Sequence, residues 1–242
     1  MVSSEAYREK MIIPFGCMKI DELFDGGLKV GELTLVYGDY GTGKTLLCFM
    51  VTLKCLEKGY KVIYVTTEKP FAIERLVQLA EKTVLEDMKK EILKNLIVIT
   101  PENFLEQTEI VYKLEFFITQ KVKLVIFDSI TERYREVLSG KKASIWANKV
   151  LNEQMALLKY IASSKEISII VTGNTTDVIS SSSQVGKDVV ASKVIKYWCD
   201  NIIRLERKDD ERILTVEVKK GTSKNISIKF KITSEGISYG YD

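Results

Sequence analysis

One short stretch has the residue types and the spacing of a loop that binds phosphate groups; it consists of Gly38, Asp39, Tyr40, Gly41, Thr42, Gly43, Lys44 and Thr45. Its glycines carry no Cβ, so successive backbone N–H groups can converge on a phosphate. Lys44 would reach the β- and γ-phosphates, and the hydroxyl of Thr45 would bind Mg²⁺. The pattern therefore predicts a nucleoside triphosphate as the ligand.

The residues on either side of this loop are expected to form the elements that it needs. Residues 32–37 are a short apolar run typical of a buried strand, and residues 44–58 contain neither Pro nor Gly and favour a helix. In this order of elements, the helix N-terminus adds partial positive charge beside the phosphate. A glycine-rich turn that matches by chance is the alternative, but it would not require these flanking elements.

A second apolar strand is predicted to end in an acid. Residues 124–127 are apolar and lead directly into Asp128. In phosphate-loop nucleotidases, an acid at this position orients the Mg²⁺ shell beside the loop hydroxyl, which here is that of Thr45. A plain carboxylate at a strand end is the alternative, and the presence of the loop favours the metal role.

Hydrolysis also requires a group that activates water, and the chain contains no histidine. A carboxylate is then the natural candidate. Glu68 follows the predicted strand 62–67, whose carboxyl end should face the ligand crevice of the sheet. The alternative is that Glu68 caps a helix beginning near Pro70.

Composition limits the class of protein. The chain has 242 residues, 45% of them hydrophobic and 29% charged, which suits one α/β domain over residues 1–242 with a short N-terminal segment, 1–12. The absence of histidine excludes metal sites and nucleophile pairs built on that residue. The net charge of +3 says little about polyanionic partners, so local clusters must decide.

The cysteines and the termini indicate a cytoplasmic protein. The four cysteines form no C-x-x-C pair, so we expect buried free thiols in a reducing compartment. The first ten residues are charged and do not resemble a signal peptide. No uncharged apolar run approaches the length that crosses a membrane.

Strands and helices are expected to alternate through most of the chain. Residues 62–65, 96–99, 122–127 and 167–171 are short β-branched runs, typical of strands buried on both faces of a parallel sheet. A helix from Pro70 to about Lys82 and two amphipathic segments lie between them. The apolar faces of these segments consist of Ile110, Val111, Leu114, Phe117 and Ile118, and of Val150, Leu151, Met155, Leu158, Ile161 and Ala162. A doubly wound sheet is the predicted architecture.

Beyond Trp198 the hydrophobic period changes to two. Residues 213–218 and 226–232 alternate apolar and polar side chains, as antiparallel strands with one exposed face do. Residues 220–225 are the predicted turn between them, and the pair should extend one edge of the parallel sheet. A loop is expected at 174–187, which contains a run of four serines.

Several local patterns resemble the RecA/RadA recombinase superfamily, and most closely its short archaeal paralogues of the RadB type. The match runs from about Ile13 to Ile237. The phosphate loop is specific only to a larger superclass. The patterns that together point to this group include Tyr64-Val65-Thr66-Thr67-Glu68, Glu74-Arg75-Leu76, Asp128-Ser129-Ile130-Thr131 with Tyr134-Arg135, Lys196-Tyr197-Trp198, and Phe230-Lys231-Ile232.

This resemblance implies a RecA-type ATPase core with ATP and Mg²⁺, in which Glu68 activates water and Asp128 serves the metal. It also implies two loops facing single-stranded DNA, at about 132–143 and 174–192. In that group ATP lies between subunits, so a homo-oligomer is possible, and Lys219 and Lys220 match positions whose cations reach in from the neighbour. The alternative for both lysines is a solvated strand end.

Three departures from the superfamily pattern shape the functional hypothesis. Too few residues precede the core for a helix-hairpin-helix domain or a Phe-x-x-Ala strand. Asn174 stands where the group has Gln as its γ-phosphate sensor, and Asn is one methylene shorter. The glycine pair of the second loop is reduced to Gly186-Lys187. These departures favour an accessory factor over an autonomous strand exchanger.

Local charge gives modest support for nucleic-acid binding. The first loop carries four basic against two acidic residues, the second loop is neutral, and residues 217–231 carry five lysines against one acid. The candidate contacts are Arg133, Tyr134, Arg135, Lys141, Lys142 and Lys187. Tyr134 would stack on a base, or instead pack beneath its loop.

The sequence thus predicts a slow ATPase that acts in homologous recombination and DNA repair and binds single-stranded DNA and a recombinase partner. A KaiC-like regulatory ATPase, which acts on a protein partner without DNA, is the alternative.

Overall fold

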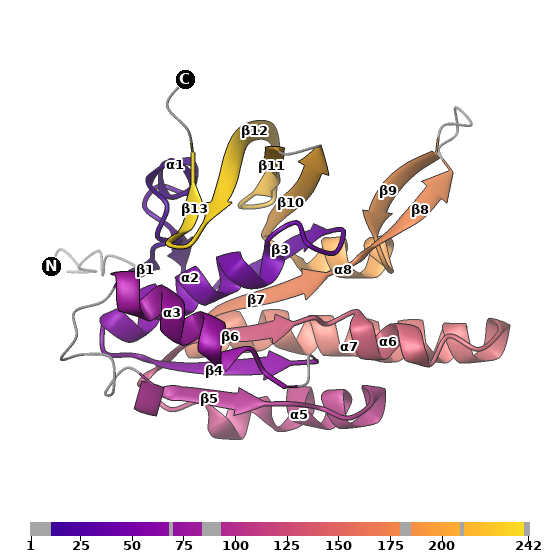
Figure 1. Ribbon diagram of the computed structural model, residues 1–242. Coiled ribbons are helices and arrows are strands. Elements are labelled where there is room, and N and C mark those ends of the chain that lie inside the picture. The colour runs from indigo at the N-terminus through magenta and orange to yellow at the C-terminus, as the bar shows by residue number, and fades with distance from the viewer. Residues whose placement is uncertain (1–10, 68–69, 84–92, 180–184, 209–210, 240–242) are drawn as a thin grey trace, which may run out of the picture.

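A nine-stranded sheet forms the centre of the protein (Figure 1) in the described part of the chain. The computed structural model describes residues 11–67, 70–83, 93–179, 185–208 and 211–239. The strand order is β13-β12-β11-β10-β3-β7-β6-β4-β5. Their bounds are β3 (Leu33–Gly38), β4 (Lys61–Thr66), β5 (Leu96–Ile99), β6 (Val122–Asp128), β7 (Ser168–Gly173), β10 (Asn201–Lys208), β11 (Glu211–Lys219), β12 (Thr222–Thr233) and β13 (Gly236–Ser238).

Helices cover both faces of this sheet, and two short strand pairs lie outside it. The helices are α1 (Met18–Leu23), α2 (Lys44–Glu57), α3 (Ile73–Thr83), α5 (Phe104–Phe117), α6 (Glu132–Glu136), α7 (Lys141–Lys165) and α8 (Ser192–Trp198). The outlying pairs are β1 (Ile12–Ile13) with β2 (Leu28–Lys29), and β8 (Thr175–Ile179) with β9 (Val185–Val189).

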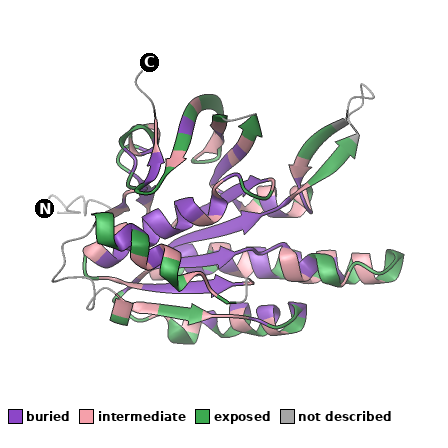
Figure 2. Cartoon of the chain, in the orientation of Figure 1, coloured by how far each residue is buried: buried purple, intermediate pink, exposed green. Residues whose placement is uncertain are grey.

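The pairing confirms the predicted mixture of parallel and antiparallel strands. Strands β10, β3, β7, β6, β4 and β5 are parallel, while β11, β12 and β13 add an antiparallel extension to the β10 edge. The central strands are buried on both faces (Figure 2), which is why their sequences are continuously apolar. Antiparallel β12 has an exposed face and keeps the alternating pattern.

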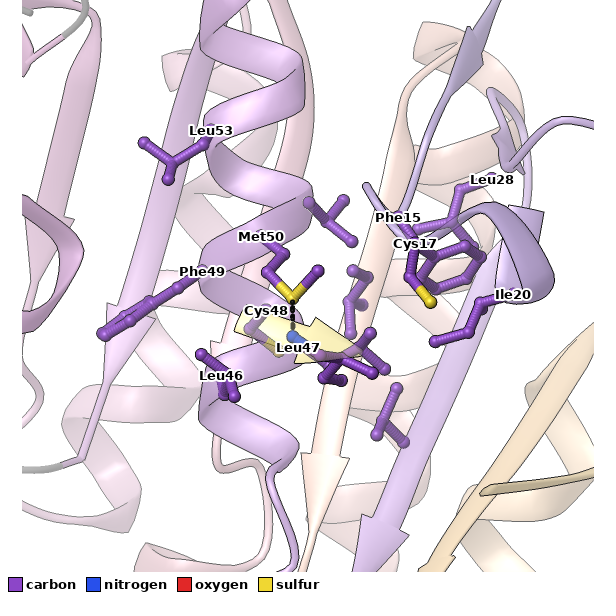
Figure 3. Packing of buried hydrophobic residues seen from close by; sticks show 14 of the residues in the cluster. Phe15, Cys17, Ile20, Leu28, Leu46, Leu47, Cys48, Phe49, Met50 and Leu53 are labelled. Atoms are coloured by element: carbon purple, nitrogen blue, oxygen red, sulfur yellow. Dashed lines mark hydrogen bonds between the residues drawn. The ribbon is translucent and has the colours of Figure 1, made fainter. Parts of the chain in front are cut away.

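A hydrophobic cluster lies on each side of the sheet. Successive residues of β3 face opposite ways, so Val36 belongs to the cluster of α2, while Leu35 and Tyr37 belong to the cluster of α7. Figure 3 shows the first cluster around Phe49 and Met50 of α2, and its dashed line joins the Met50 sulfur to the N–H of Ile237, 3.3 Å away. The phosphate loop is therefore carried by a strand and a helix that are both anchored in the core.

Some predicted boundaries are wrong. Helix α3 begins at Ile73, because the Ala72 carbonyl accepts the first helical bonds, and Pro70 precedes the helix. Phe117 is 53% exposed although it was expected on the buried face of α5. The turn between β11 and β12 consists of two residues, Lys220 and Gly221, both with positive φ, as tight hairpin turns require.

Both predicted loops contain regular structure. The segment expected as the first loop forms α6 and the beginning of α7. The segment expected as the second loop contains the hairpin β8–β9, whose connecting residues 180–184 lie outside the described part. Within the described ranges, none of the helices is long and apolar enough to cross a membrane.

Candidate nucleotide-binding site

The glycine-rich loop lies between the end of β3 and the first residue of α2, as its sequence predicts. Gly41 and Gly43 have φ of 75° and 107°, in the left-handed region that glycine adopts without strain. Gly38 is required for a different reason: a Cβ there would lie 2.1 Å from the carbonyl oxygen of Leu205 on neighbouring β10. The loop also closes on itself, because the Thr42 hydroxyl donates to the carbonyl of Asp39 at 2.8 Å.

Gly38→Ala is expected to lower the free energy of unfolding by about 1–3 kcal/mol, because the new methyl group meets a backbone atom that cannot move away cheaply. The midpoint of urea unfolding measures this effect. Gly186→Ala is the matched control, since its Cβ would approach Val178 no closer than 4.0 Å. Equal midpoints for the two variants would contradict the close packing of the loop on β10.

The loop borders a pocket of about 460 Å³, which is within the range of small-molecule sites. Lys44, Thr45 and Asp128 all line it, so the structure brings together the predicted phosphate and metal ligands. The Lys44 ammonium donates to the carbonyl oxygens of Gly38 and Asp39, each at 2.9 Å. The Lys44 cation therefore lies against the backbone of the loop, beside the residues that are predicted to bind phosphate.

The chemistry of this donor set fits Mg²⁺ held together with phosphate. Among the described residues, no group of three or more His, Cys, Asp or Glu side chains is placed to hold a metal ion. Mg²⁺ does not need such a cage, because it usually keeps several waters and binds one or two carboxylates plus substrate phosphates. Asp128 and the hydroxyl of Thr45 provide that partial set in the pocket.

Asn174, the predicted γ-phosphate sensor, lines the pocket. Its side-chain amide donates to the hydroxyl of Tyr40 at 3.1 Å and to the carboxylate of Glu132 at 2.9 Å. Only 4% of Asn174 is exposed. The sensor role stays a prediction, but the amide already joins the phosphate loop to the beginning of α6.

Asp39 of the phosphate loop contacts the β8–β9 hairpin. Its carboxylate accepts hydrogen bonds from Lys187 and from the hydroxyl of Thr175. These bonds, that of Lys187 first, hold the pKa of Asp39 below its usual range. Asp39 thus attaches the loop to the hairpin, and the hydrogen bond from Tyr40 to Glu132 attaches it to α6, so the loop contacts both segments that were expected to face DNA.

Sequence reasoning missed several residues that line the pocket. Arg75 on α3 donates to the carbonyl of Thr233 at 3.2 Å, and Ile232 of β12 packs over Gly43. Glu132 also borders the pocket. The signal for Arg75 was its place in the family pattern, whereas nothing local in the sequence indicated Ile232.

Glu68, the predicted catalytic carboxylate, lies outside the described residues. Thr67, which precedes it, lines the pocket and donates its backbone N–H to the Asp128 carbonyl at 3.0 Å. The role of Glu68 stays a prediction.

Of the two alternatives predicted for Tyr134, stacking on a base or packing beneath its loop, the structure shows the second. Tyr134 is 3% exposed, its ring lies edge-on to Phe104 at a centroid distance of 5.9 Å, and its hydroxyl donates to Asn148 at 3.1 Å. Its ring therefore packs from α6 against Phe104 of α5, because a large ring gains more from burial than from exposure.

The candidate DNA-binding cations differ in how far they are already engaged. Arg133 is paired with Glu136 at 2.5 Å and also donates to the carbonyls of Pro101 and Thr67. Lys187 is paired with Asp39. Arg135, Lys141 and Lys142 are exposed. These last three therefore remain the best placed of the set.

Lys219 and Lys220, the predicted trans-acting cations, both pair with Asp25 of their own chain. Their ammonium groups lie 2.9 and 3.3 Å from its carboxylate oxygens. These hydrogen bonds, that of Lys219 first, lower the pKa of Asp25 to about 2. A role across a subunit boundary stays a prediction.

The four cysteines are buried and free, as expected. Burial raises the pKa of the Cys55 thiol to about 12 and that of Cys48 well above its usual value. These thiols behave as core residues rather than nucleophiles.

A phosphate loop between a central strand and its helix, an acid at the end of a nearby strand, and an antiparallel C-terminal extension define a phosphate-loop nucleotide-binding protein of the RecA class. The chain belongs to the Rad51 family, whose profile matches residues 7–239. Members of this family generally bind ATP with Mg²⁺ and are generally ATPases. The recognised superfamily and the predicted fold are thus confirmed.

Curated relatives and a solved structure agree with this assignment. The chain is 32% identical over 219 residues to the DNA repair and recombination protein RadB of Methanococcus maripaludis, covering 90% of this chain and 96% of the relative. It is 35% identical over 226 residues to the protein of the same name from Thermococcus kodakarensis, covering 92% and 96%. A crystal structure of the RadB recombinase superposes with a TM-score of 0.76 and 32% identity, covering 95% of this chain and 100% of that one.

Proposed function

We propose that this chain binds ATP with Mg²⁺, hydrolyses it slowly, and serves as an accessory factor in homologous recombination and DNA repair. It would bind single-stranded DNA and a recombinase partner. The observation that carries the proposal is the pocket that gathers Lys44, Thr45 and Asp128 in a chain of the Rad51 family.

In the proposed reaction, each side chain has a separate task. Lys44 exchanges its two loop carbonyls for phosphate oxygens, and the loop amides hold the phosphate in place. Thr45 and Asp128 would hold Mg²⁺, which would neutralise part of the negative charge of the phosphates. Glu68 would orient water. Slow turnover is expected because the short amide of Asn174 is already engaged by Tyr40 and Glu132.

The proposed DNA surface lies beside the pocket. The beginning of α7 and the β8–β9 hairpin both extend from the same end of the sheet (Figure 1). A hollow of about 300 Å³ separates them, lined by Asn148 of α7, Thr176 and Val178 of β8, and Lys193 of α8. Exposed Lys141 and Lys142 lie on the same helix as Asn148. Phosphate contacts from such cations supply most sequence-independent affinity.

Replacing Lys141 and Lys142 together by Gln is expected to weaken binding of a fluorescent single-stranded oligonucleotide about tenfold at low salt. The slope of log affinity against log salt should fall by about 1.4, since each phosphate contact on a single strand contributes about 0.7. The titration is run with and without ATP. The double variant Lys113→Gln and Lys121→Gln, two exposed lysines away from this surface, is the control.

The same titration distinguishes the alternative function. If the wild-type protein binds no oligonucleotide at low salt, with or without ATP, the DNA-binding proposal fails. A KaiC-like regulatory ATPase would then be favoured, in which ATP is a conformational ligand. The bonds from Asp39 and Tyr40 to the hairpin and to α6 give that alternative its structural basis. Size measurement with ATP and DNA tests whether the protein forms a homo-oligomer.

A further inference from the structure

Asp128 receives one hydroxyl hydrogen bond on each of its two carboxylate oxygens. Tyr64 of β4 donates to Oδ2 at 2.8 Å, and Thr172 of β7 donates to Oδ1 at 2.6 Å. These strands flank β6 on its two sides. Both donors are fully buried, and Asp128 is 6% exposed. The carboxylate of Asp128 is therefore hydrogen-bonded from both neighbouring strands at the border of the pocket.

The packing of Tyr64 fixes the direction of its hydroxyl group. Its ring contacts Phe49 of α2 and Phe71, with centroid distances of 5.7 and 5.1 Å. The sheet register sets Thr66 opposite Asp128. Tyr64 lies two residues earlier in β4 and therefore faces the same side of the sheet as Thr66, from which its hydroxyl reaches the Asp128 carboxylate. Thr172 is set by the pairing of β7 with β6, in which Val171 lies opposite Phe127.

A buried tyrosine normally finds some hydrogen-bond partner, so one such bond alone would indicate only a satisfied core residue. Two features point further. Both oxygens of one carboxylate are engaged by different strands, and that carboxylate shares the pocket with Thr45. An ionised carboxylate accepts about four hydrogen bonds, so each oxygen retains capacity for a water molecule of a metal ion.

We propose that Tyr64 and Thr172 are positioning residues that fix the carboxylate of Asp128 for its contact with nucleotide-bound Mg²⁺. This assignment rests on the function proposed above. The partners of a metal-binding group orient it, and their loss typically costs 10–100-fold in metal affinity. The two hydroxyl hydrogen bonds end on Asp128 rather than on the phosphate loop, so nucleotide binding without metal is expected not to depend on them.

The test measures the dissociation constant of a fluorescent ATP analogue in saturating Mg²⁺ and in EDTA. The ratio of the two constants reports the contribution of the metal. Tyr64→Phe and Thr172→Val are each expected to reduce that ratio about tenfold while leaving the EDTA value within about twofold of wild type. Thr172→Ser keeps the hydroxyl and should restore the wild-type ratio. Tyr134→Phe removes a buried tyrosine hydroxyl that donates to Asn148 instead of Asp128 and should change neither constant.

The thermal unfolding midpoint of each variant shows whether it is folded under the conditions of the titration. Because the two donors come from different strands, each variant tests the proposal independently of the other. The proposal is overturned if Tyr64→Phe and Thr172→Val leave the ratio unchanged, or if they weaken binding equally in EDTA, which is the pattern of a purely structural role. A wild-type protein that binds no nucleotide in either condition would overturn the proposed function as well.

Discussion

Replacing Lys44 with Ala is expected to weaken ATP binding at least about 100-fold and to remove turnover. Lys44 supplies the only side-chain cation of the phosphate loop, and its ammonium now bonds two loop carbonyls that phosphate oxygens would replace. Hydrogen bonds to charged groups contribute about 1.5–3 kcal/mol each. Loss of two such bonds therefore corresponds to two or more orders of magnitude in the dissociation constant. Calorimetric titration with Mg²⁺ and ATP measures the effect.

The control for this variant lies at the other end of the same helix. Lys58 follows α2, and its ammonium donates to the carbonyl of Ile12, away from the pocket. Lys58→Ala should therefore leave ATP affinity unchanged. If Lys44→Ala kept wild-type affinity while remaining folded, the phosphate loop would not be the nucleotide site, and the proposed function would fail with it.

The local part of this fold could be predicted because it depends on residues that are neighbours in the chain. The phosphate loop needs left-handed glycines at fixed spacing, and the central strands need continuous apolar runs. Both requirements are visible in the sequence. The ends of β3 and β6 accordingly placed Lys44, Thr45 and Asp128 in one pocket, as expected.

What could not be predicted concerns contacts between distant segments. The sequence left two positions open for Tyr134, and the choice between them depends on Phe104, thirty residues earlier in the chain. The hydroxyls that hold Asp128 depend on the register of three strands. The serine run suggested a loop, whereas the residues on either side of it pair as β8 and β9. Period and composition contain no information on such pairings.

The phosphate loop and the proposed DNA surface are joined by side chains rather than merely adjacent. Asp39 accepts from Thr175 and Lys187 of the hairpin, and Tyr40 donates to Glu132 of α6 at 3.0 Å. Any ligand that moves Asp39 or Tyr40 must break or rearrange these bonds. ATP and DNA would therefore influence each other's binding, with an equal coupling free energy in both directions.

Glu68→Gln is expected to reduce ATP turnover about 10²–10⁴-fold, the usual contribution of a general base, while changing ATP affinity by no more than about twofold. The amide keeps the size of the side chain but cannot accept the proton of water. Glu68 follows Thr67, a residue of the pocket, and the chain has no histidine to take the task. Phosphate release at saturating ATP measures turnover, and the fluorescent analogue measures affinity.

Glu132 is the carboxylate that could replace Glu68 in this role, since it lines the pocket along with Asp128. Its Oε2 atom already accepts from Tyr40 and Asn174, which suits a residue that holds the loop rather than one that takes a proton. Glu132→Gln is therefore expected to keep most of the turnover while weakening the effect of DNA on ATP binding. If Glu132→Gln lost turnover and Glu68→Gln kept it, the two assignments would have to be exchanged.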